Sequence, residues 1–280
     1  MRSSRSGKSP FVRRERGFAR KGERRHGTHA PAGAHAEGTV VLYGWHTVRA
    51  ALENPARRIR TLLATENAAR RLAGEGIPLP VEPQLVRPDE IARRLPADAV
   101  HNGLLAEAEA LTSPELHEIA PGGIVLALDQ ITDPHNVGAI LRTAAAFAAA
   151  AVITTSRHSP DATPVLAKSA SGALEHVPLV AVQNLARALA QLRDRGYFLA
   201  GLDSSAEGDL GVAALRAPLA LVLGAEGKGL RQQIRESCDV LARLDLPGRI
   251  KSLNVSNAAA LALYIATKRT GENTTPLMRR

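Results

Sequence analysis

Residues 123–149 have the sequence GIVLALDQITDPHNVGAILRTAAAFAA, in which an apolar run, a polar loop and a helical pattern follow one another. Ile124 to Leu128 is a short apolar run typical of a buried strand, and Val137 to Ala149 carries the apolar spacing of a helix. The same alternation continues through most of the chain that follows. This order predicts an α/β fold with a parallel sheet.

The alternation assigns strands and helices throughout this C-terminal part. The expected strands are Ile124–Leu128, Ala151–Thr154, Val177–Val180, Phe198–Leu202, Leu219–Leu223 and Val240–Leu244. The expected helices are Val137–Ala149, Thr163–Lys168, Leu185–Arg195, Leu230–Glu236 and Asn254–Lys268. In open α/β sheets ligands bind beyond the carboxyl ends of the strands, so the loops after the strands are the places to look for chemistry.

The positive charge of the 280-residue chain is concentrated at its N-terminus. The formal net charge is +9, and residues 1–26 contain ten basic and two acidic residues, whereas the other 254 contain 26 basic and 25 acidic ones. Residues 1–38 have few large apolar side chains, so we expect a disordered basic arm. Such an arm favours a polyanionic partner, although an Arg-rich start is also compatible with a cleaved transit peptide.

The length predicts about two domains, and the composition places their boundaries. Residues 39–110 are expected to form a small α/β domain, with strands at Val40–Leu42, Ile59–Ala64, Val81, Leu85–Val86 and Leu104–Ala106 and helices at Thr47–Asn54, Asn67–Ala73 and Asp89–Arg94. Residues 111–122, with two prolines and the first of a pair of glycines, are interpreted as a linker. Residues 123–272 are expected to form the larger domain, and 273–280 a flexible C-terminus.

Several classes of protein are excluded by what the sequence lacks. The single cysteine, Cys238, cannot form an intrachain disulfide or a cysteine-based zinc site, which fits a reducing compartment. His117-Glu118 has no second histidine at zinc-protease spacing, so we expect no metal. The longest apolar runs hold about ten residues, roughly half of a membrane span. No glycine pattern matches a phosphate-binding or dinucleotide-binding loop.

Three loops after expected strands carry side chains suited to catalysis. Asn136 is a plausible N-cap, and Arg142 follows it by six residues, so both can lie near one helix end. Glu226 stands among three glycines of the segment 224–229, and Ser252, Asn254 and Ser256 offer hydroxyl and amide groups before the last helix. Helix capping explains most of these residues without any catalytic role. A simple turn does not explain a glutamate among the glycines.

Taken together, the three loops resemble the motifs of the SpoU (TrmH) family of S-adenosylmethionine-dependent RNA 2′-O-methyltransferases. Residues 133–144 (DPHNVGAILRTA) resemble its first motif, 223–227 (LGAEG) its second and 252–256 (SLNVS) its third, in the family's order and spacing. Residues 168–175 (KSASGALE) are similar to the family's middle region. Residues 43–46 and 101–103 are similar to the small substrate-binding domain of the RlmB-type branch, which methylates a guanosine of 23S rRNA. One departure is Leu244-Asp245-Leu246, where the family usually has Ile-Pro-Met.

The resemblance implies a fold, a cofactor and partners. The fold is a SPOUT α/β domain whose parallel sheet ends in a trefoil knot, preceded by an L30e-like RNA-binding domain. The cofactor is S-adenosylmethionine, with no metal, and the cofactor-contact candidates are Leu223, Gly224, Ala225, Leu244, Gly248 and Leu253. The implied partners are RNA, with rRNA preferred over tRNA, and a second copy of the chain, with helix 254–268 at the dimer interface. Tyr43, His46, His101 and Arg142 are candidates for contact with RNA.

The resemblance also implies catalytic roles. Arg142 matches the family's essential arginine, and because a guanidinium is ordinarily a cation we expect it to bind phosphate and stabilise the developing alkoxide. Direct action of Arg142 as a base is a second option. Asn136, Glu226, Ser252 and Asn254 would orient the ribose, the arginine and the loops, and Glu226 is an alternative base if it is buried.

The alternatives differ in substrate and in class. A SpoU enzyme that acts on tRNA would share every catalytic motif, and a noncatalytic RNA-binding or ribosome-assembly protein could have the same fold. The bacterial cytoplasm is the expected location, and the mitochondrial matrix is the alternative.

Overall fold

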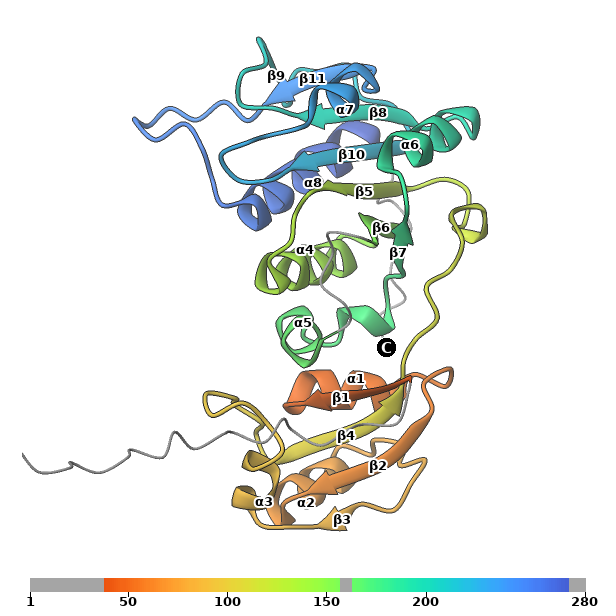
Figure 1. The fold of residues 1–280 in the computed structure, drawn as a ribbon, viewed down its shortest axis with the longest axis vertical. Helices are drawn as coiled ribbons and strands as arrows, with labels where there is room; N and C mark the ends of the chain where they lie inside the picture. Colours follow the sequence, from red (N-terminus) through yellow and green to blue (C-terminus); the bar gives the residue numbers. More distant parts are fainter. Residues whose placement is uncertain (1–37, 157–162, 272–280) are drawn as a thin grey trace, which may run out of the picture. The chain divides into compact units, whose positions relative to one another are not determined.

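A computed structural model describes residues 38–156 and 163–271. The arm predicted for residues 1–38, apart from Gly38, and the tail predicted for 273–280 lie outside this part of the chain. The described residues contain two sheets, shown in Figure 1 with their helices.

The first sheet belongs to residues 39–109 and has the strand order β1-β4-β2-β3. Its strands are β1 (Thr39–Tyr43), β2 (Ile59–Ala64), β3 (Gln84–Leu85) and β4 (Leu104–Glu109), and its helices are α1 (Trp45–Glu53), α2 (Glu66–Gly74) and α3 (Pro88–Ala92). β4 pairs antiparallel with both β1 and β2. The strand expected at Val81 is wrong, because pairing with β2 begins only at Gln84.

The second sheet is parallel, as the alternation of strands and helices predicts. Its order is β7-β6-β5-β10-β8-β11-β9, and every pair of neighbours is parallel. The strands are β5 (Ile124–Asp129), β6 (Ala151–Thr155), β7 (Leu179–Val182), β8 (Phe198–Leu202), β9 (Gly208–Asp209), β10 (Leu219–Gly224) and β11 (Val240–Arg243). The short β9 was not predicted. The trefoil knot and the L30e-like character of the first sheet stay predictions.

Helices and short turns cover the parallel sheet on two faces. They are η1 (Leu116–Glu118), α4 (Pro134–Ala146), α5 (Pro164–Ala170), η2 (Ala173–Glu175), α6 (Leu185–Asp194), α7 (Gln232–Glu236) and α8 (Val255–Thr270). One apolar core contains residues of α4, α5 and α8, and a second contains residues of α6 and α7. Leu126 and Leu128 of β5 face the first core, and Val125 and Ala127 face the second, as strand alternation requires.

The start of α4 differs from the prediction. Asp133 is the N-cap, accepting a hydrogen bond from the His135 backbone N–H at 3.0 Å, and Pro134 occupies the first helical position. Asn136 is therefore not a cap but lies inside the first turn. Proline is favoured at that first position because its missing N–H would have no partner there, so the helix begins three residues earlier than predicted.

The segment 111–122, interpreted as a linker, is packed against the parallel sheet. Leu116 and Ile119 are buried in the core shared with α6. Arg195 donates to the carbonyl oxygens of both residues, at 2.5 and 2.6 Å, and the Tyr197 hydroxyl donates to Gly122 O at 2.9 Å. These bonds fix the path of the chain between the two sheets.

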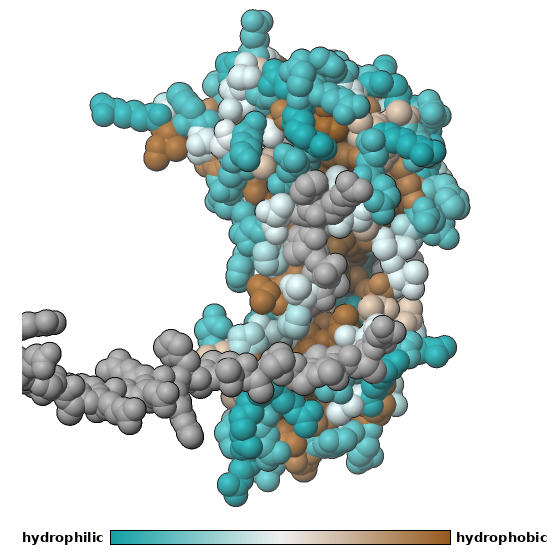
Figure 2. All heavy atoms as spheres, viewed as in Figure 1, coloured by the Kyte–Doolittle hydropathy of each residue, from teal (hydrophilic) through white to brown (hydrophobic). Residues whose placement is uncertain are grey.

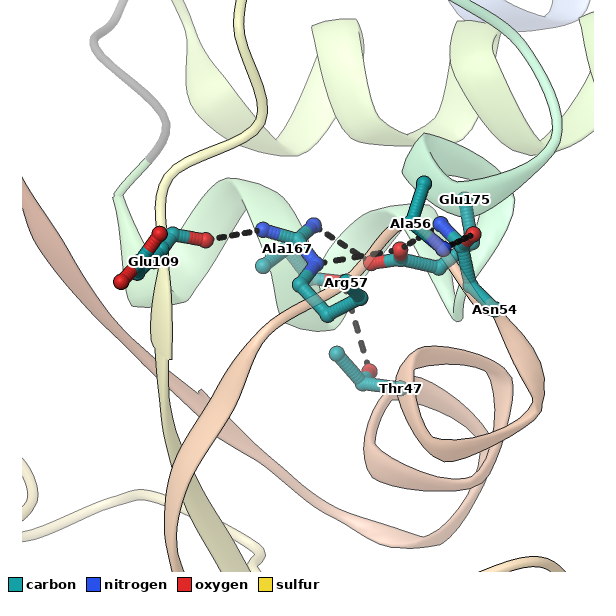
Figure 3. A network of polar contacts seen from close by, with 7 residues as sticks. All are labelled: Thr47, Asn54, Ala56, Arg57, Glu109, Ala167 and Glu175. Carbon is teal, nitrogen blue, oxygen red and sulfur yellow. Dashed lines mark hydrogen bonds and ion pairs between the residues drawn. The ribbon is translucent and has the colours of Figure 1, made fainter. Parts of the chain in front are cut away.

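A buried ion pair joins the two sheets (Figure 3). The Arg57 guanidinium, beside β2, donates to both carboxylate oxygens of Glu175 in η2, at 3.1 Å from Nε and 2.5 Å from Nη2. Asn54 donates to the same carboxylate at 2.7 Å, and Arg57 also donates to Glu109 O at 2.8 Å. Only 3% of the Arg57 side chain and 2% of the Glu175 side chain are exposed. The pair therefore connects residues 118 positions apart in a place with little solvent.

A cavity of about 520 Å³ lies next to this junction, with Val40, Leu42, Leu174 and Leu179 among its lining residues. In Figure 2 hydrophobic atoms are exposed between the two sheets, whereas hydrophilic atoms cover much of the outer surface in this view. None of the predicted catalytic or cofactor-contact residues lines this cavity. Within residues 38–156 and 163–271, no helix has the length and apolar character needed to cross a bilayer.

Candidate active site

The three loops singled out in the sequence meet beyond the carboxyl ends of β5, β10 and β11 (Figure 1). Asn254 Nδ2 donates to Glu226 Oε1 at 2.6 Å and to Asn136 Oδ1 at 2.9 Å. Asn136 Nδ2 lies 3.4 Å from the same Glu226 oxygen, which also accepts from the Val255 backbone N–H at 3.1 Å. The carboxylate of Glu226, from the second motif, thus connects Asn136 of the first motif with Asn254 of the third. We call Asn136, Glu226 and Asn254 the catalytic cluster.

The glycines around Glu226 form a tight turn after β10. Ala225 and Gly229 pair across it, with the Gly229 N–H donating to Ala225 O at 2.9 Å. A Cβ on Gly224 would overlap the carbonyl group of Gly229, so the turn can close only with glycine at this position. Glu226 is exposed at the tip of the turn, where it faces the other two motifs. A role for Glu226 as the base required that its side chain be buried, and this side chain is exposed.

Asn254 is oriented by its own helix. It is the N-cap of α8, and its Oδ1 accepts from Ser256 N at 2.9 Å and from Ser256 Oγ at 2.5 Å. Because the oxygen is used for capping, the amide nitrogen is left to donate to Glu226 and Asn136. Asn254 therefore caps α8 and belongs to the catalytic cluster at the same time. The sequence alone could not show which of these two roles it has.

A cavity of about 550 Å³ adjoins the catalytic cluster. Leu223, Gly224, Ala225, Leu244 and Leu253 line it, together with Glu226 and Ser252, whereas Gly248 does not. Its volume is in the range of cofactor and small-molecule sites. Leucine side chains and the backbone of the Gly224 turn supply a surface that suits a ligand with both apolar and polar parts.

A second cavity, of about 500 Å³, lies on the other side of Glu226. Gln130, Thr132, Asp133 and Asn136 line it, and it shares Ala225, Glu226, Lys228 and Val255 with the first. Glu226 and its turn therefore form a wall between two cavities. Such an arrangement can hold two molecules on either side of one set of polar groups.

Two buried carboxylates near the site were missed by the sequence reasoning. Asp129, at the end of β5, is fully buried and accepts from Arg231 N at 3.0 Å and Arg231 Nε at 2.8 Å. Asp203, after β8, lines the larger cavity and is bonded to Arg235 and to Ser205 N, the latter at 2.8 Å. Each aspartate directly follows the apolar run of a strand, and a charged residue in such a place is seldom buried unless it has a partner. This position was the sequence signal for a buried, paired carboxylate. Asp129 fixes the chain after the Glu226 turn to the end of β5.

Other predicted residues lie outside the catalytic cluster. Arg142 is on α4, six residues beyond Asn136, and is exposed. Among the described residues it has no hydrogen bond or ion pair. The expectation that it lies near the same helix end as Asn136 is wrong, because Asn136 is in the first turn of the 13-residue α4 and Arg142 is in its second half. Six residues advance a helix by about 9 Å, nearly two turns. His46 is exposed on α1, whereas Tyr43 is buried and His101 lies in the turn before β4.

Family models match both parts of the chain. Residues 123–264 match the SpoU rRNA methylase family, and residues 41–114 match an RNA 2′-O ribose methyltransferase substrate-binding domain. The chain belongs to the SpoU rRNA methylase family. The resemblance inferred from its motifs is thus confirmed.

The relatives that this SpoU chain resembles match it over most of its length. It is 37% identical over 236 residues to the 23S rRNA (guanosine-2′-O-)-methyltransferase RlmB of Pseudomonas putida, covering 81% of this chain and 95% of the relative. It is 40% identical over 238 residues to RlmB of Pseudomonas aeruginosa, covering 80% and 94%. The crystal structure of the SpoU methyltransferase AviRb from Streptomyces viridochromogenes, in complex with AdoMet, has a TM-score of 0.70 at 26% identity, covering 83% of this chain and 90% of that one.

No group of three or more metal-ligating side chains is found in the part of this SpoU chain that the structure describes.

Proposed function

We propose that the protein transfers a methyl group from S-adenosylmethionine to the ribose 2′-hydroxyl of a guanosine in 23S rRNA. The observation that carries this proposal is the convergence of Asn136 and Asn254 on Glu226, which lines the 550 Å³ cavity. Identity of 37–40% with RlmB proteins over about four fifths of the chain supports the same reaction.

The larger cavity is the proposed cofactor site. The backbone at Leu223 and Gly224 and the side chains of Leu244 and Leu253 would hold the cofactor, whose sulfonium supplies an electrophilic methyl group. The smaller cavity, on the other side of Glu226, would take the target ribose. Binding on the two sides of Glu226 would place the ribose hydroxyl in line with the methyl group, and such positioning can supply much of the rate enhancement.

The catalytic cluster has a positioning role in this proposal. Glu226 Oε1 already accepts from two amides and one backbone N–H, so the carboxylate is used to hold the three motifs in place. Arg142, exposed and without an ion pair to any described residue, supplies positive charge for a phosphate and for the alkoxide that forms as the ribose hydroxyl loses its proton.

A homodimer is part of the proposal. Asn257, Leu261, Tyr264 and Lys268 recur at helical spacing on α8 and are all exposed, with exposed fractions of 43% for Leu261 and 53% for Tyr264. Large apolar side chains on one helix face suit an interface with another protein surface. We place the second copy on this face, where it would complete an active site that includes Arg142.

Such a protein acts where ribosomes are assembled, and we propose the bacterial cytoplasm as its location.

The test is methyl transfer from labelled S-adenosylmethionine to unmodified 23S rRNA and tRNA, with mapping of 2′-O-methyl positions. We expect one methylated guanosine in 23S rRNA. Methylation of tRNA alone would move the assignment to a tRNA enzyme of the family. Cofactor binding without transfer to either RNA, including rRNA in assembly intermediates, would favour a noncatalytic RNA-binding protein.

The matched variants are Arg142→Ala and Arg216→Ala. Both remove one exposed arginine, but Arg216 precedes β10 and so lies near the amino end of the strand whose carboxyl end carries Glu226. We expect Arg142→Ala to lower the transfer rate about 100-fold or more, the typical loss for a group that stabilises transition-state charge. Arg216→Ala should stay close to wild type. Equal rates in the two variants would remove Arg142 from the mechanism.

A further inference from the structure

The segment 168–175 resembles a family motif, yet the catalytic cluster does not use it. It begins on α5, which packs against both sheets. Ala167 is buried in the apolar core of the first sheet, and Thr47 Oγ1 donates to Ala167 O at 3.3 Å. Lys168, the next residue, therefore lies where the N-terminal sheet meets the methyltransferase domain.

The ammonium of Lys168 contacts two neutral groups. Its Nζ lies 3.4 Å from Asn102 Oδ1 and 5.6 Å from the centroid of the Tyr43 ring. Gly44, with φ of 86°, leaves the space that the ammonium occupies, because a Cβ there would overlap Nζ. Among the ion pairs of the described residues none includes Lys168.

A partly buried cation without a counterion is unfavourable, and burial lowers the pKa of Lys168 from its ordinary value. An anion supplied from outside the chain would remove this penalty. Asn102 and Tyr43 keep the lysine side chain in position but provide no negative charge of their own at neutral pH.

His101 adds a second donor beside Lys168. Its Nδ1 accepts a hydrogen bond from Gly103 N at 3.1 Å. Because Nδ1 accepts, the proton of the neutral ring is on Nε2, and burial and then the positive charge of Lys168 lower the pKa of His101. An ammonium and an imidazole N–H then lie in the same small region. Both are donors, as a phosphate oxygen requires.

The same stretch of α5 leads to the catalytic cluster. Ser169 Oγ lies 3.2 Å from His135 Nδ1, and His135 precedes Asn136 in the first turn of α4. Polar contacts therefore run from Asn102 through Lys168 and Ser169 to His135 and the first motif. A nucleic acid strand held by the N-terminal sheet and entering the active site would pass along these residues.

We propose that Lys168 binds a backbone phosphate of the RNA substrate at this junction. The inference rests on the proposed function and names a contact that the substrate makes between its binding domain and the site of methyl transfer. A phosphate fits better than a base edge, because a lysine ammonium acts as a point charge.

The experiment compares the salt dependence of RNA binding in full-length Lys168→Gln, Arg216→Gln and wild type. Each variant loses one positive charge, but Arg216 precedes β10 and is distant in sequence from every contact described above. The probe is unmodified 23S rRNA transcript, titrated at several potassium chloride concentrations. We expect Lys168→Gln to bind about tenfold more weakly at low salt. The slope of log affinity against log salt should fall by about 0.7, the loss of one single-strand phosphate contact. Arg216→Gln should keep the wild-type slope.

Two further variants separate charge from folding. Lys168→Arg should restore the slope, and Lys168→Met, which keeps an unbranched apolar stem, should lose it while retaining cofactor binding and the wild-type unfolding midpoint. A Lys168→Gln variant with the wild-type slope and affinity would overturn the inference. If wild type still methylates 23S rRNA in that case, the proposed function stands; a wild-type protein that binds no RNA would overturn both.

Discussion

Glu175 and Glu226 are two glutamates with similar hydrogen-bond partners and different surroundings. Each accepts from an asparagine amide and from two further N–H groups, supplied by Arg57 for Glu175 and by Asn136 and the Val255 backbone for Glu226. Glu175 is 2% exposed by side chain and joins two sheets, whereas Glu226 is exposed and joins three loops. Burial decides what each carboxylate does: the first determines how the chain packs, and the second determines how the site is arranged.

The largest expected effect follows from removing the buried carboxylate. Glu175→Ala would leave the Arg57 guanidinium buried without its counterion, a change that typically costs about 3–5 kcal/mol. Equilibrium unfolding in urea measures this loss of stability. The control is Glu53→Ala, which removes an exposed ion pair with Arg49 and should cost about 1 kcal/mol or less.

A Glu175→Ala variant no less stable than Glu53→Ala would show that the junction is not fixed by this pair. Replacing both partners at once, as Arg57→Met with Glu175→Leu, should recover much of the stability, since no unpaired charge would then be buried.

The second prediction concerns the exposed carboxylate. Glu226→Ala should change the free energy of unfolding by less than about 1 kcal/mol, because water can satisfy the groups that Glu226 leaves. Methyl transfer should fall about 100-fold, since the three motifs would lose their common acceptor and a misplacement of about 1 Å has that effect. Transfer assays and urea unfolding are measured on the same preparations.

Glu236→Ala is the matched control for that experiment. Glu236 is exposed on α7 and accepts from the Gln232 amide at 2.7 Å, but it is not part of the catalytic cluster. Its removal should affect neither rate nor stability. Wild-type transfer in Glu226→Ala would mean that the convergence of the three motifs has no catalytic consequence.

The sequence was a better guide to the exposed cluster than to the buried junction. Apolar strands alternating with helices predicted the parallel sheet, and a parallel sheet brings its strand-end loops to one edge, so Asn136, Glu226 and Asn254 could be proposed as one site. Nothing local predicts the pairing of Arg57 with Glu175, because charged residues usually face solvent and these two are 118 positions apart.

Local competition explains the smaller errors. Asp133 followed by Pro134 is a stronger helix start than Asn136, so α4 begins earlier and Asn136 is free to bond with Asn254. Arg142 follows Asn136 by six residues on the same helix, which separates the two residues by nearly two turns of α4.

The smallest expected effect concerns the edge of the junction and the way it responds to pH. Burial, and then the charge of Lys168, lower the pKa of His101 below its ordinary value of 6.5. The unfolded chain therefore takes up this proton more readily than the folded one. The contribution of His101 to stability is fully present above pH 6.5 and declines as the pH falls through the lower pKa of the folded state.

Measuring the unfolding midpoint of wild type and His101→Gln between pH 5 and 8 isolates this contribution from that of the other histidines. Wild type should lose slightly more stability on acidification than the variant, and the difference should be small because His101 is only partly buried. Identical pH profiles would show that the pKa of His101 is not lowered in the folded protein.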